Sequence, residues 1–465
     1  MKIGLVGSSS QQRSLPFNAE RTVNLFPVLD PRGSDVAALY GTPGLSVFSV
    51  AGSGPCRGSL SASNGRAFVV SSNVLYEIAS NGTATARGTL TTSSGTVSIC
   101  ENGLQLAICD GTNGYILTYA TNVFTQITDP DFPSPKYISF VDGYFVVTKN
   151  NSGQFYLSGL YDGLSWDPLK FATAESSPDD LSCAISYVGQ LGLIGSNTLE
   201  IWRNTGDSVF PFSRISGSTP VGTVAPFSVI SIDTSVYWVG NTNQGTGIVY
   251  QAQGFSPKRI STEPIEIILQ REPNPERLVS WSYQQDGHAF LVITGGALET
   301  SLVYDLSTGA WHERAYLNSL GNYEQHLGSC CMYAHDRILV GDRTNGNVYT
   351  MSLNTYSDNG SPIKRTRIYT HLIDELKPVR YNELKLGFET GVGLQSGQGS
   401  NPIVSLRVSK DGARTWSNYY TTQIGAVGIY GQEVNFRRLG IQTQCTFEIT
   451  FSDPVKVAIT GSYLR

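Results

Sequence analysis

Histidine and cysteine, the residue types that most often bind metals, are few in this sequence and do not form a ligand pattern. The 465 residues include five histidines and seven cysteines. A zinc protease needs an HxH or HExxH spacing, and neither occurs. His326 and His335 flank the adjacent pair Cys330-Cys331, but neighbouring cysteines rarely hold one ion together, and no CxxC accompanies them. We therefore expect no metal site and no cofactor.

Acidic residues would suit a glycosidase, which needs two carboxylates ~5–9.5 Å apart across a sugar bond. Glu175, Asp179 and Asp180 lie together in ATAESSPDD, and Glu263 and Glu266 lie in STEPIE. Acidic residues are common in loops, and spacing along the chain does not give their separation in space. The GxSxG elbow of serine hydrolases and the GxxxxGK[ST] phosphate loop are absent from the sequence. We predict that the protein is not an enzyme, and we name no catalytic or cofactor-binding residue.

One segment near the C-terminus resembles a motif of sugar-binding propellers. Ser409–Trp416 reads SKDGARTW, close to the aspartate box Ser-x-Asp-x-Gly-x-Thr-Trp of sialidases, with its glycine one position early, at Gly412. Such boxes hold a hairpin turn through hydrogen bonds from side chains to the backbone, so their role is structural. A plain Asp-Gly hairpin is the simpler interpretation, and a carbohydrate-binding or glycan-cleaving propeller remains an alternative function.

Basic residues are too few for a protein that coats DNA. The chain has 32 Lys and Arg against 37 Asp and Glu, a net charge of −5, whereas nucleic-acid binders are typically basic. Two short clusters, Lys364-Arg365-Thr366-Arg367 and Arg437-Arg438, could contact a partner's carboxylate or phosphate, although on strands such clusters are more often simply solvated. A weakly charged, acidic chain is consistent with a channel through which DNA slides. Each contact between a cation and a phosphate would add affinity and friction, and this chain has few cations to make such contacts.

The composition indicates a large all-β protein. Hydrophobic residues make up 40% and charged residues 15%, against roughly 25% charged in an average soluble protein. Glycine (49) and tyrosine (24) are abundant, and methionine (3) is rare, which favours strands and turns over helices. We expect no membrane span, since no apolar run approaches ~20 residues, no signal peptide, and reduced, mostly buried thiols.

Hairpin signals recur along the chain at nearly regular intervals. Type I′ turns favour Asn-Gly and Asp-Gly pairs, which begin at Asn64, Asn81, Asn102, Asp110, Asn113, Asp142, Asp162, Asp286, Asn345, Asn359 and Asp411. A unit of turn, apolar strand, loop and Tyr- or Trp-rich strand starts at Asn64, Asn102, Asp142, Val188, Asp233, Asp286 and His335. A period of about 40–50 residues with four strands per unit is typical of β-propeller blades.

We therefore predict an all-β chain with a β-propeller of about seven blades, with six to eight possible because the first and last blades often combine strands from both ends. A set of β-sandwiches with similar turns is the alternative. The predicted parts are an extended N-terminal arm (1–57), the propeller (58–373) and a C-terminal antiparallel β-sandwich (374–465). One short helix is predicted at Pro264–Gln270, with Thr262 as its N-cap.

Four segments, in order along nearly the whole chain, resemble the tail-hub proteins of short-tailed bacteriophages, also called packaged-DNA stabilisation or tail-nozzle proteins. The first contains Asn24-Leu25-Phe26-Pro27, Pro43-Gly44 and Arg57-Gly58. The others are FATAESSPDD…GSNTLEIW, with Ala174-Glu175-Ser176 and Pro178-Asp179, then LVYDLSTGAWHE from Leu302, and the terminal DPVKVAITG from Asp453.

This resemblance implies a structural virion protein. Such hubs form six-fold homo-oligomeric rings below the portal and its adaptor, close the DNA channel after packaging and so stabilise packaged DNA. They connect to tail spikes or fibres and to a plug or needle, while double-stranded DNA passes without sequence-specific binding. The resemblance also implies assembly in the host cytoplasm and a final location in the virion, with the arm and the sandwich as places for neighbour contacts. A propeller scaffold unrelated to phage is a further alternative.

Overall fold

Strands dominate the computed structural model, which describes residues 2–30, 37–174, 177–254 and 256–465. Within these ranges the only α-helix is α1 (Glu263–Gln270), with 3-10 turns at Pro226–Ser228 and Pro275–Arg277. Thr262 is the N-cap and Pro264 lies in the first turn, which confirms the predicted short helix. No helix in the described part of the chain is long and apolar enough to cross a membrane.

Five four-stranded antiparallel sheets follow one another from residue 56 to residue 259. Their strands are β5 (Cys56–Ser61), β6 (Ala67–Ser71), β7 (Val74–Ile78), β8 (Ala84–Thr89); β9 (Ser98–Glu101), β10 (Gln105–Cys109), β11 (Gly114–Thr118), β12 (Val123–Gln126); β13 (Pro135–Val141), β14 (Tyr144–Lys149), β15 (Gln154–Gly159), β16 (Asp162–Thr173); β17 (Leu181–Tyr187), β18 (Gln190–Gly195), β19 (Leu199–Asn204), β20 (Phe212–Arg214); and β21 (Ile230–Ile232), β22 (Ser235–Thr242), β23 (Gly245–Gln251), β24 (Lys258–Arg259).

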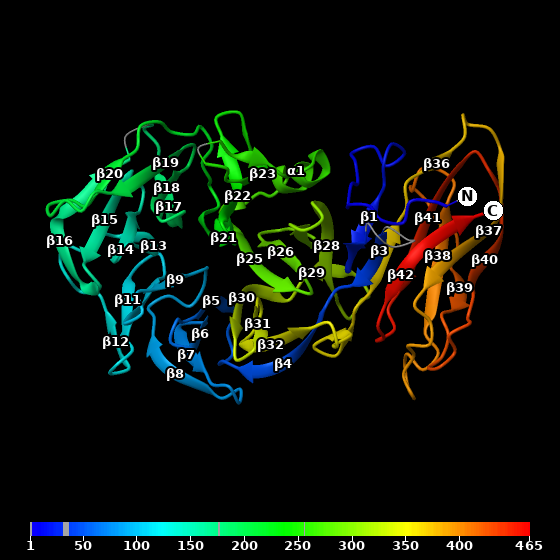
Figure 1. Cartoon of the computed structure of the whole chain (residues 1–465), viewed down its shortest axis with the longest axis horizontal. Coiled ribbons are helices and arrows are strands. Elements are labelled where there is room, and N and C mark those ends of the chain that lie inside the picture. The colour runs from blue at the N-terminus through cyan, green and yellow to red at the C-terminus, as the bar shows by residue number, and fades with distance from the viewer. Residues whose placement is uncertain (1, 31–36, 175–176, 255) are drawn as a thin grey trace.

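Two further units complete the ring of sheets seen in Figure 1. One contains β25 (Leu278–Gln285), β26 (His288–Gly295), β27 (Ser301–Asp305) and β28 (Ala310–Leu317), with β29 (Tyr323–Gln325) beside β28. The other contains β30 (Gly328–Ala334), β31 (Arg337–Asp342), β32 (Asn347–Ser352), β4 (Gly44–Val50), β33 (Ser357–Asp358) and β34 (Ser361–Pro362). Its strand β4 comes from the start of the chain and pairs with β32, so the ring is closed by strands from distant segments.

Each of the seven units predicted from the sequence supplies the two middle strands of one of these sheets, such as β6 and β7 after Asn64. Apolar side chains fill the space between neighbouring sheets. Phe68 and Leu75 of one sheet pack with Leu106 and Tyr115 of the next, and burial of each such side chain contributes about 1.5–3 kcal/mol. A single hairpin has no such neighbour, which is why the repeated unit is stable only in the ring.

The turns follow the prediction only in part. Both residues have positive φ, as a type I′ turn requires, at Asp142-Gly143, Asp286-Gly287 and Asn359-Gly360. In the other eight Asn-Gly and Asp-Gly pairs at least one residue keeps a negative φ. At Asn64-Gly65, for example, the Asn64 side chain accepts a hydrogen bond from the backbone of Arg66 (3.1 Å), so the asparagine closes the turn with its side chain instead.

The C-terminal part is a two-sheet sandwich beside the propeller (Figure 1). One sheet has the order β2 (Leu25–Leu29), β3 (Ala37–Gly41), β42 (Ala458–Leu464), β37 (Val379–Phe388) and β40 (Val434–Gln442). The other contains β35 (Arg365–Ile368), β41 (Gln444–Phe451), β38 (Ile403–Ser409) and β39 (Tyr420–Gln423), with β36 (Leu372–Ile373) beside β41. Both fold predictions, the propeller and the sandwich, are therefore confirmed.

Strand pairing divides the chain differently from the predicted boundaries at 57/58 and 373/374. The N-terminal segment is shared between the two domains, since Ile3 and Leu5 lie in the sandwich core and β4 lies in the propeller. β1 (Arg21–Val23) pairs with β28 of the propeller and with β35, which itself pairs with β41. One continuous sheet therefore runs from the propeller into the sandwich. A sequence pattern shows that a segment is a strand, but not which sheet it joins.

Candidate functional site

The histidines and cysteines near residue 330 have structural roles. The His326 ring is buried and packs against Trp281, with 5.7 Å between ring centroids, and His335 Nε2 lies 2.9 Å from the Ile78 carbonyl oxygen. Burial raises the pKa of the Cys331 thiol well above its ordinary value, so it stays protonated. Among the described residues no three His, Cys, Asp or Glu side chains are grouped to hold a metal ion.

Two of the five acidic residues considered for sugar chemistry are engaged in local structure. Asp179 accepts hydrogen bonds from the backbone of Asn197 (2.8 Å) and Thr198 (3.1 Å), which shapes the turn between β18 and β19. Glu266 accepts hydrogen bonds from Arg259 and from Ser261 (2.6 Å). Asp180 and Glu263 are exposed. Glu175 lies outside the described residues.

The aspartate-box segment forms a turn held by its own side chains. Asp411 accepts hydrogen bonds from the backbone of Arg414 (3.1 Å) and Thr415 (2.9 Å) and from the Thr415 hydroxyl (2.6 Å). These hydrogen bonds, together with one donated by the Ser409 hydroxyl (2.8 Å), hold the pKa of Asp411 well below its usual range. The carboxylate is thus used to close the turn, as the sequence comparison with such boxes predicted.

A buried polar cluster lies where the N-terminal arm meets the propeller. Glu313 on β28 is buried and accepts three hydrogen bonds from Arg21 on β1 (2.6, 2.9 and 3.1 Å). The hydroxyls of Ser9 (3.0 Å) and Thr300 (2.7 Å) also donate to its carboxylate. Burial alone would raise the pKa of Glu313, but the Arg21 charge and these hydrogen bonds outweigh it and hold the pKa below its ordinary value.

Asn24 links the arm to both domains. Its side-chain nitrogen donates to the carbonyl oxygens of Ala315 and Lys364, and its side-chain oxygen accepts from the Ala315 backbone nitrogen, each at 2.9 Å. The backbone of Asn24 has φ +56°, a conformation that asparagine tolerates better than most residues. This one buried side chain thus joins β28 of the propeller to the segment that leads into β35.

The first basic cluster of the sequence is internal. Arg365 and Arg367 are 1% and 0% exposed, so neither guanidinium is available to a partner. Arg367 pairs with Glu20 of the arm and donates to the Leu5 carbonyl oxygen (2.9 Å). Arg365 and Arg367 therefore do not form the solvated face that the sequence favoured, and contact of this cluster with a partner stays a prediction that only the partly exposed Lys364 leaves open.

Two further motif residues of the sequence also have structural roles. The Arg57 guanidinium donates to the carbonyl oxygens of Ser72, Thr92, Ser94 and Gly95 at 2.6–2.8 Å, and so fixes the loop before β9. At Gly44 a Cβ atom would lie 2.5 Å from two backbone oxygens, so a larger residue does not fit where β4 enters the propeller.

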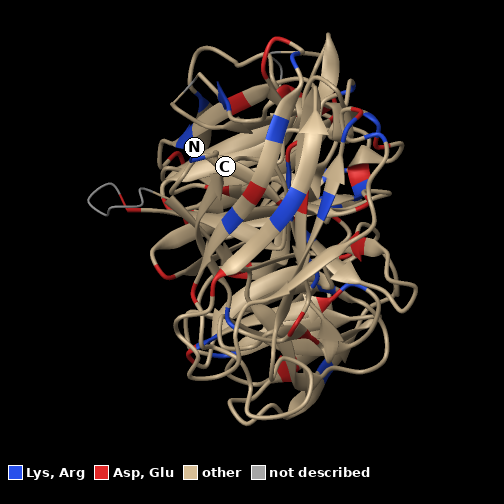
Figure 2. Cartoon of the chain, turned by 90° about the vertical axis from the view of Figure 1, so that its right-hand side faces the viewer, with Lys and Arg blue, Asp and Glu red and all other residues tan. Residues whose placement is uncertain are grey.

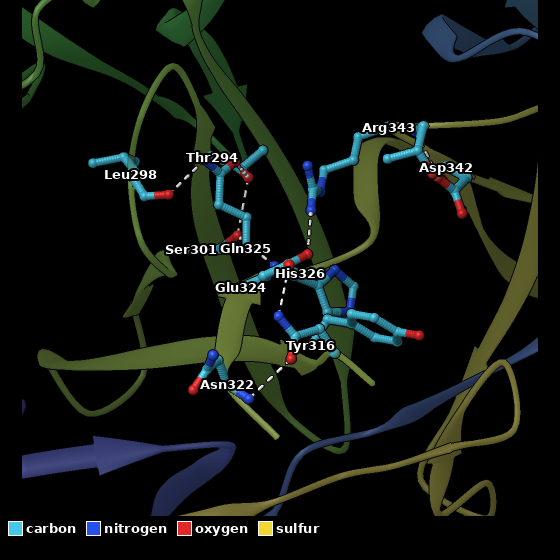
Figure 3. A network of polar contacts seen from close by, with 12 residues as sticks. Thr294, Leu298, Ser301, Tyr316, Asn322, Glu324, Gln325, His326, Asp342 and Arg343 are labelled. Carbon is cyan, nitrogen blue, oxygen red and sulfur yellow. Dashed lines mark hydrogen bonds and ion pairs between the residues drawn. The ribbon is translucent and has the colours of Figure 1, made fainter. Parts of the chain in front are cut away.

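A second polar network joins the last two propeller units (Figure 3). Gln325 of β29 is buried, accepts from the Thr294 hydroxyl (3.1 Å) and the Gly295 backbone (2.9 Å), and donates to the Leu298 carbonyl oxygen (2.6 Å). Its neighbour Glu324 points the other way and reaches Arg343, 3.5 Å away, in the loop after β31. The strand is thereby held between β26 and β31.

Replacing Gln325 with alanine should destabilise the fold by about 2–3 kcal/mol, because buried donors and acceptors are left without partners. Urea unfolding followed by tryptophan fluorescence measures the change. The matched control is Glu324→Ala on the same strand, whose exposed ion pair contributes about 0–1 kcal/mol. Equal effects of the two substitutions would show that the Gln325 network does not stabilise the junction.

A buried carboxylate lies between two buried arginines beside the entry of β4. Burial raises the pKa of Asp358 to about 6, although the charges of Arg314 and Arg365 act in the opposite direction. Burial likewise lowers the pKa of Arg365 to about 10. Arg314 donates to the Pro43 carbonyl oxygen (2.8 Å), so this group of charges adjoins the segment that leads from the sandwich to the propeller.

The raised pKa of Asp358 makes the stability of the folded chain depend on pH. Because the folded pKa of Asp358 exceeds its ordinary value of 3.8, its contribution is fully present below pH 3.8 and is lost as the pH rises to about 6. Relative to Asp358→Asn, the unsubstituted chain should therefore lose about 1–3 kcal/mol of stability across that range. Urea unfolding of both proteins at several pH values measures this, and parallel pH profiles would contradict it.

The inner strands of the propeller line a small, open central cavity of about 230 Å³. Residues of β5, β9, β25 and β30 line it, including Ser59, Ser98, Ser280 and Ser329. The major groove of duplex DNA alone is about 12 Å wide, so a duplex cannot pass through a cavity of this size.

Comparison with protein families gives two matches that together cover almost the whole chain. A family model described as "Bacteriophage P22 Gp10, beta-propeller" matches residues 1–356, and one described as "Bacteriophage P22 Gp10, beta-sandwich" matches residues 365–465. No curated protein matches the sequence.

Solved structures resemble the chain only at low identity. YCF48 from Cyanidioschyzon merolae is 11% identical with a TM-score of 0.42, over 66% of this chain and 98% of that one. The Cps50 (Swd1) β-propeller domain of Myceliophteria thermophila is 9% identical with a TM-score of 0.42, over 66% and 99%. The extracellular domain of BT4673 from B. thetaiotaomicron is 11% identical with a TM-score of 0.45, over 85% of this chain and 48% of that one, so this chain spans about half its length.

Proposed function

The chain belongs to the family of bacteriophage P22 Gp10, the tail-hub proteins of short-tailed phages, and from this membership we propose that it builds a ring in the phage tail. The observation that carries the proposal is the pair of family matches, in the order propeller then sandwich, along nearly the whole chain. Six copies would form the ring below the portal and its adaptor.

The DNA channel of this ring runs between the copies. The cavity inside one propeller, about 230 Å³, supports this arrangement because it leaves no room for a duplex within a subunit. A net charge of −5 suits a channel wall along which DNA slides, since such a wall makes few contacts between cations and phosphates. The buried positions of Arg365 and Arg367 agree with this, because they remove two cations from any DNA-facing surface.

The junction of arm, propeller and sandwich suits a part that closes a pressurised channel. The continuous strand pairing through β1 and the buried pair Arg21–Glu313 couple the two domains, so they are expected to move as one body. In this proposal the ring retains packaged DNA until ejection, and its outer surfaces attach tail spikes or fibres and a plug or needle.

Exposed apolar side chains support such attachments. Large hydrophobic residues that protrude from a soluble protein often mark contact surfaces, and here they include Phe17 on the arm, Leu169 and Val188 on the propeller and Tyr430 on the sandwich, all more than 70% exposed. The ring and the attached tail parts would cover these side chains.

Electron microscopy tests the proposal. Purified full-length protein should form rings of six copies, and labelled protein should lie below the portal in purified virions. A chain that stays monomeric at every concentration and is absent from virions would overturn it. A glycosidase assay on host glycans tests the alternative, and cleavage lost on substitution of one acidic residue would support a glycan-cleaving propeller instead.

A further inference from the structure

The sandwich and the rest of the chain carry opposite charge. Residues 365–465 contain 12 Lys and Arg and 8 Asp and Glu, a net charge of +4, whereas the remaining residues contain 20 and 29, a net charge of −9. Figure 2, which looks onto the sandwich end, shows basic residues along its strands. A domain with this excess attracts acidic partners.

Four arginines gather at one edge of the sandwich, and we call them the arginine edge: Arg380 on β37, Arg437 and Arg438 on β40, and Arg465 after β42. Arg380, Arg437 and Arg438 lie around a surface hollow of about 510 Å³ whose lining also includes Gly440. Arg438 has φ +62° and lies at an irregularity in the pairing of β37 with β40, where the register shifts between Tyr381 and Glu383.

The arginine edge has more positive charge than its neighbours neutralise. Glu383 is the one acidic residue that lines the hollow, and it pairs with both Arg437 (3.1 Å) and Arg465 (3.9 Å). Arg380 and Arg438 have no ion pair among the described residues, whereas nearby lysines do, as in Lys385–Glu433 (2.6 Å). Neighbouring like charges repel one another, so an anionic partner would relieve the repulsion.

The same edge offers unpaired backbone. β40 is the last strand of its sheet and pairs only with β37, so its outward backbone groups have no strand partner there. Ile441, opposite Arg380 in the register, is 60% exposed. An open strand edge accepts an extended polypeptide through main-chain hydrogen bonds, and the flanking side chains select its sequence.

We propose that the arginine edge binds an extended, acidic polypeptide segment of a partner chain, which adds to the sheet along β40 and places carboxylates against Arg380 and Arg438. A neutral strand would desolvate the guanidiniums without neutralising them, and arginine forks match carboxylates in two-point hydrogen bonds. Duplex DNA is disfavoured because it has no backbone amides to pair with β40. The proposal does not depend on the ring proposed above.

Binding of labelled peptides to the full-length protein tests this inference. The probe is a peptide of alternating threonine and glutamate as long as β40, compared with the same peptide carrying glutamine or lysine. The acidic peptide should bind about tenfold or more tightly than the glutamine peptide, and added salt should weaken it. The lysine peptide should not bind.

The double variant Arg380→Glu, Arg438→Asn should bind the acidic peptide about tenfold or more weakly, and asparagine tolerates the positive φ at residue 438. The matched control is Lys410→Glu, Arg414→Asn, which changes two exposed sandwich cations at the aspartate-box turn by the same charge and should bind normally. Equal binding by both double variants, no binding of the acidic peptide, or tighter arginine-dependent binding of duplex DNA would overturn the proposal.

Discussion

Replacing Glu313 with alanine is expected to destabilise the folded chain by about 3–5 kcal/mol, because removing one partner of a buried ion pair leaves the other uncompensated. Arg21 would keep its charge in a largely buried place, and the hydroxyls of Ser9 and Thr300 would lose their acceptor. The measurement is urea unfolding at neutral pH. We also expect faster proteolysis of the arm, since β1 would lose its side-chain anchor.

The matched control is Glu433→Ala, which removes the exposed Lys385–Glu433 pair and should cost about 0–1 kcal/mol. Acid provides a second test with Glu313→Gln. The depressed pKa of Glu313 means that its contribution is present above its ordinary value of 4.5 and is lost as the pH falls through the lower folded pKa. The difference in free energy of unfolding between the unsubstituted chain and Glu313→Gln should therefore become smaller as the pH falls through the folded pKa of Glu313. A difference constant down to acid pH would contradict the ion-pair argument.

Replacing Asn24 with alanine is expected to cost more than about 3 kcal/mol as well. Three hydrogen bonds are lost. The buried backbone N–H and C=O of Ala315 each lose a partner at about 1–3 kcal/mol, whereas the part-buried Lys364 oxygen keeps the Tyr323 hydroxyl (3.4 Å) as a donor. Alanine at φ +56° adds strain of roughly 1–2 kcal/mol. Urea unfolding measures the total.

Asn24→Gly separates the two effects, because glycine adopts positive φ without strain but also lacks the side-chain hydrogen bonds. The glycine variant should be more stable than Asn24→Ala by about 1 kcal/mol, the strain that glycine avoids. It should still be less stable than the unsubstituted chain, because the side-chain hydrogen bonds are lost in both variants. A glycine variant as stable as the unsubstituted chain would show that the backbone conformation, and not the bridge between domains, is what Asn24 supplies.

These two substitutions also bear on the ring. If the arm junction holds propeller and sandwich as one body, Asn24→Ala and Glu313→Ala should reduce ring assembly in proportion to the stability they remove. Gln325→Ala, inside the propeller, should lower stability without separating the domains. Limited proteolysis at residues 363–364, between β34 of the propeller and β35, distinguishes the two cases, because only a loosened junction exposes that connection.

Asn24 and Arg57 show what the sequence motifs identified and what they did not. Both lie in segments that carry the family resemblance, so their positions were marked in the sequence, but their roles were not. The pattern did not show that Asn24 bonds to Ala315, 291 residues away, or that Arg57 holds the loop before β9. Glu313 ends the resembling segment LVYDLSTGAWHE and received no role either. Neither Arg21 nor Gln325 was assigned a role, because nothing in their local sequence distinguishes them from other polar residues on strands.

The sequence by itself determined the all-β class, the seven repeated hairpins, the short helix after Thr262 and the C-terminal sandwich. These features depend on side-chain alternation and turn residues, which act over a few neighbouring positions. Only the tertiary structure decided that β4 closes the ring, that β1 joins the two domains, that Arg367 is buried against Glu20, and that Arg380 and Arg438 share one open edge. Contacts between residues hundreds of positions apart depend on which sheets pack together, and no local pattern records that choice.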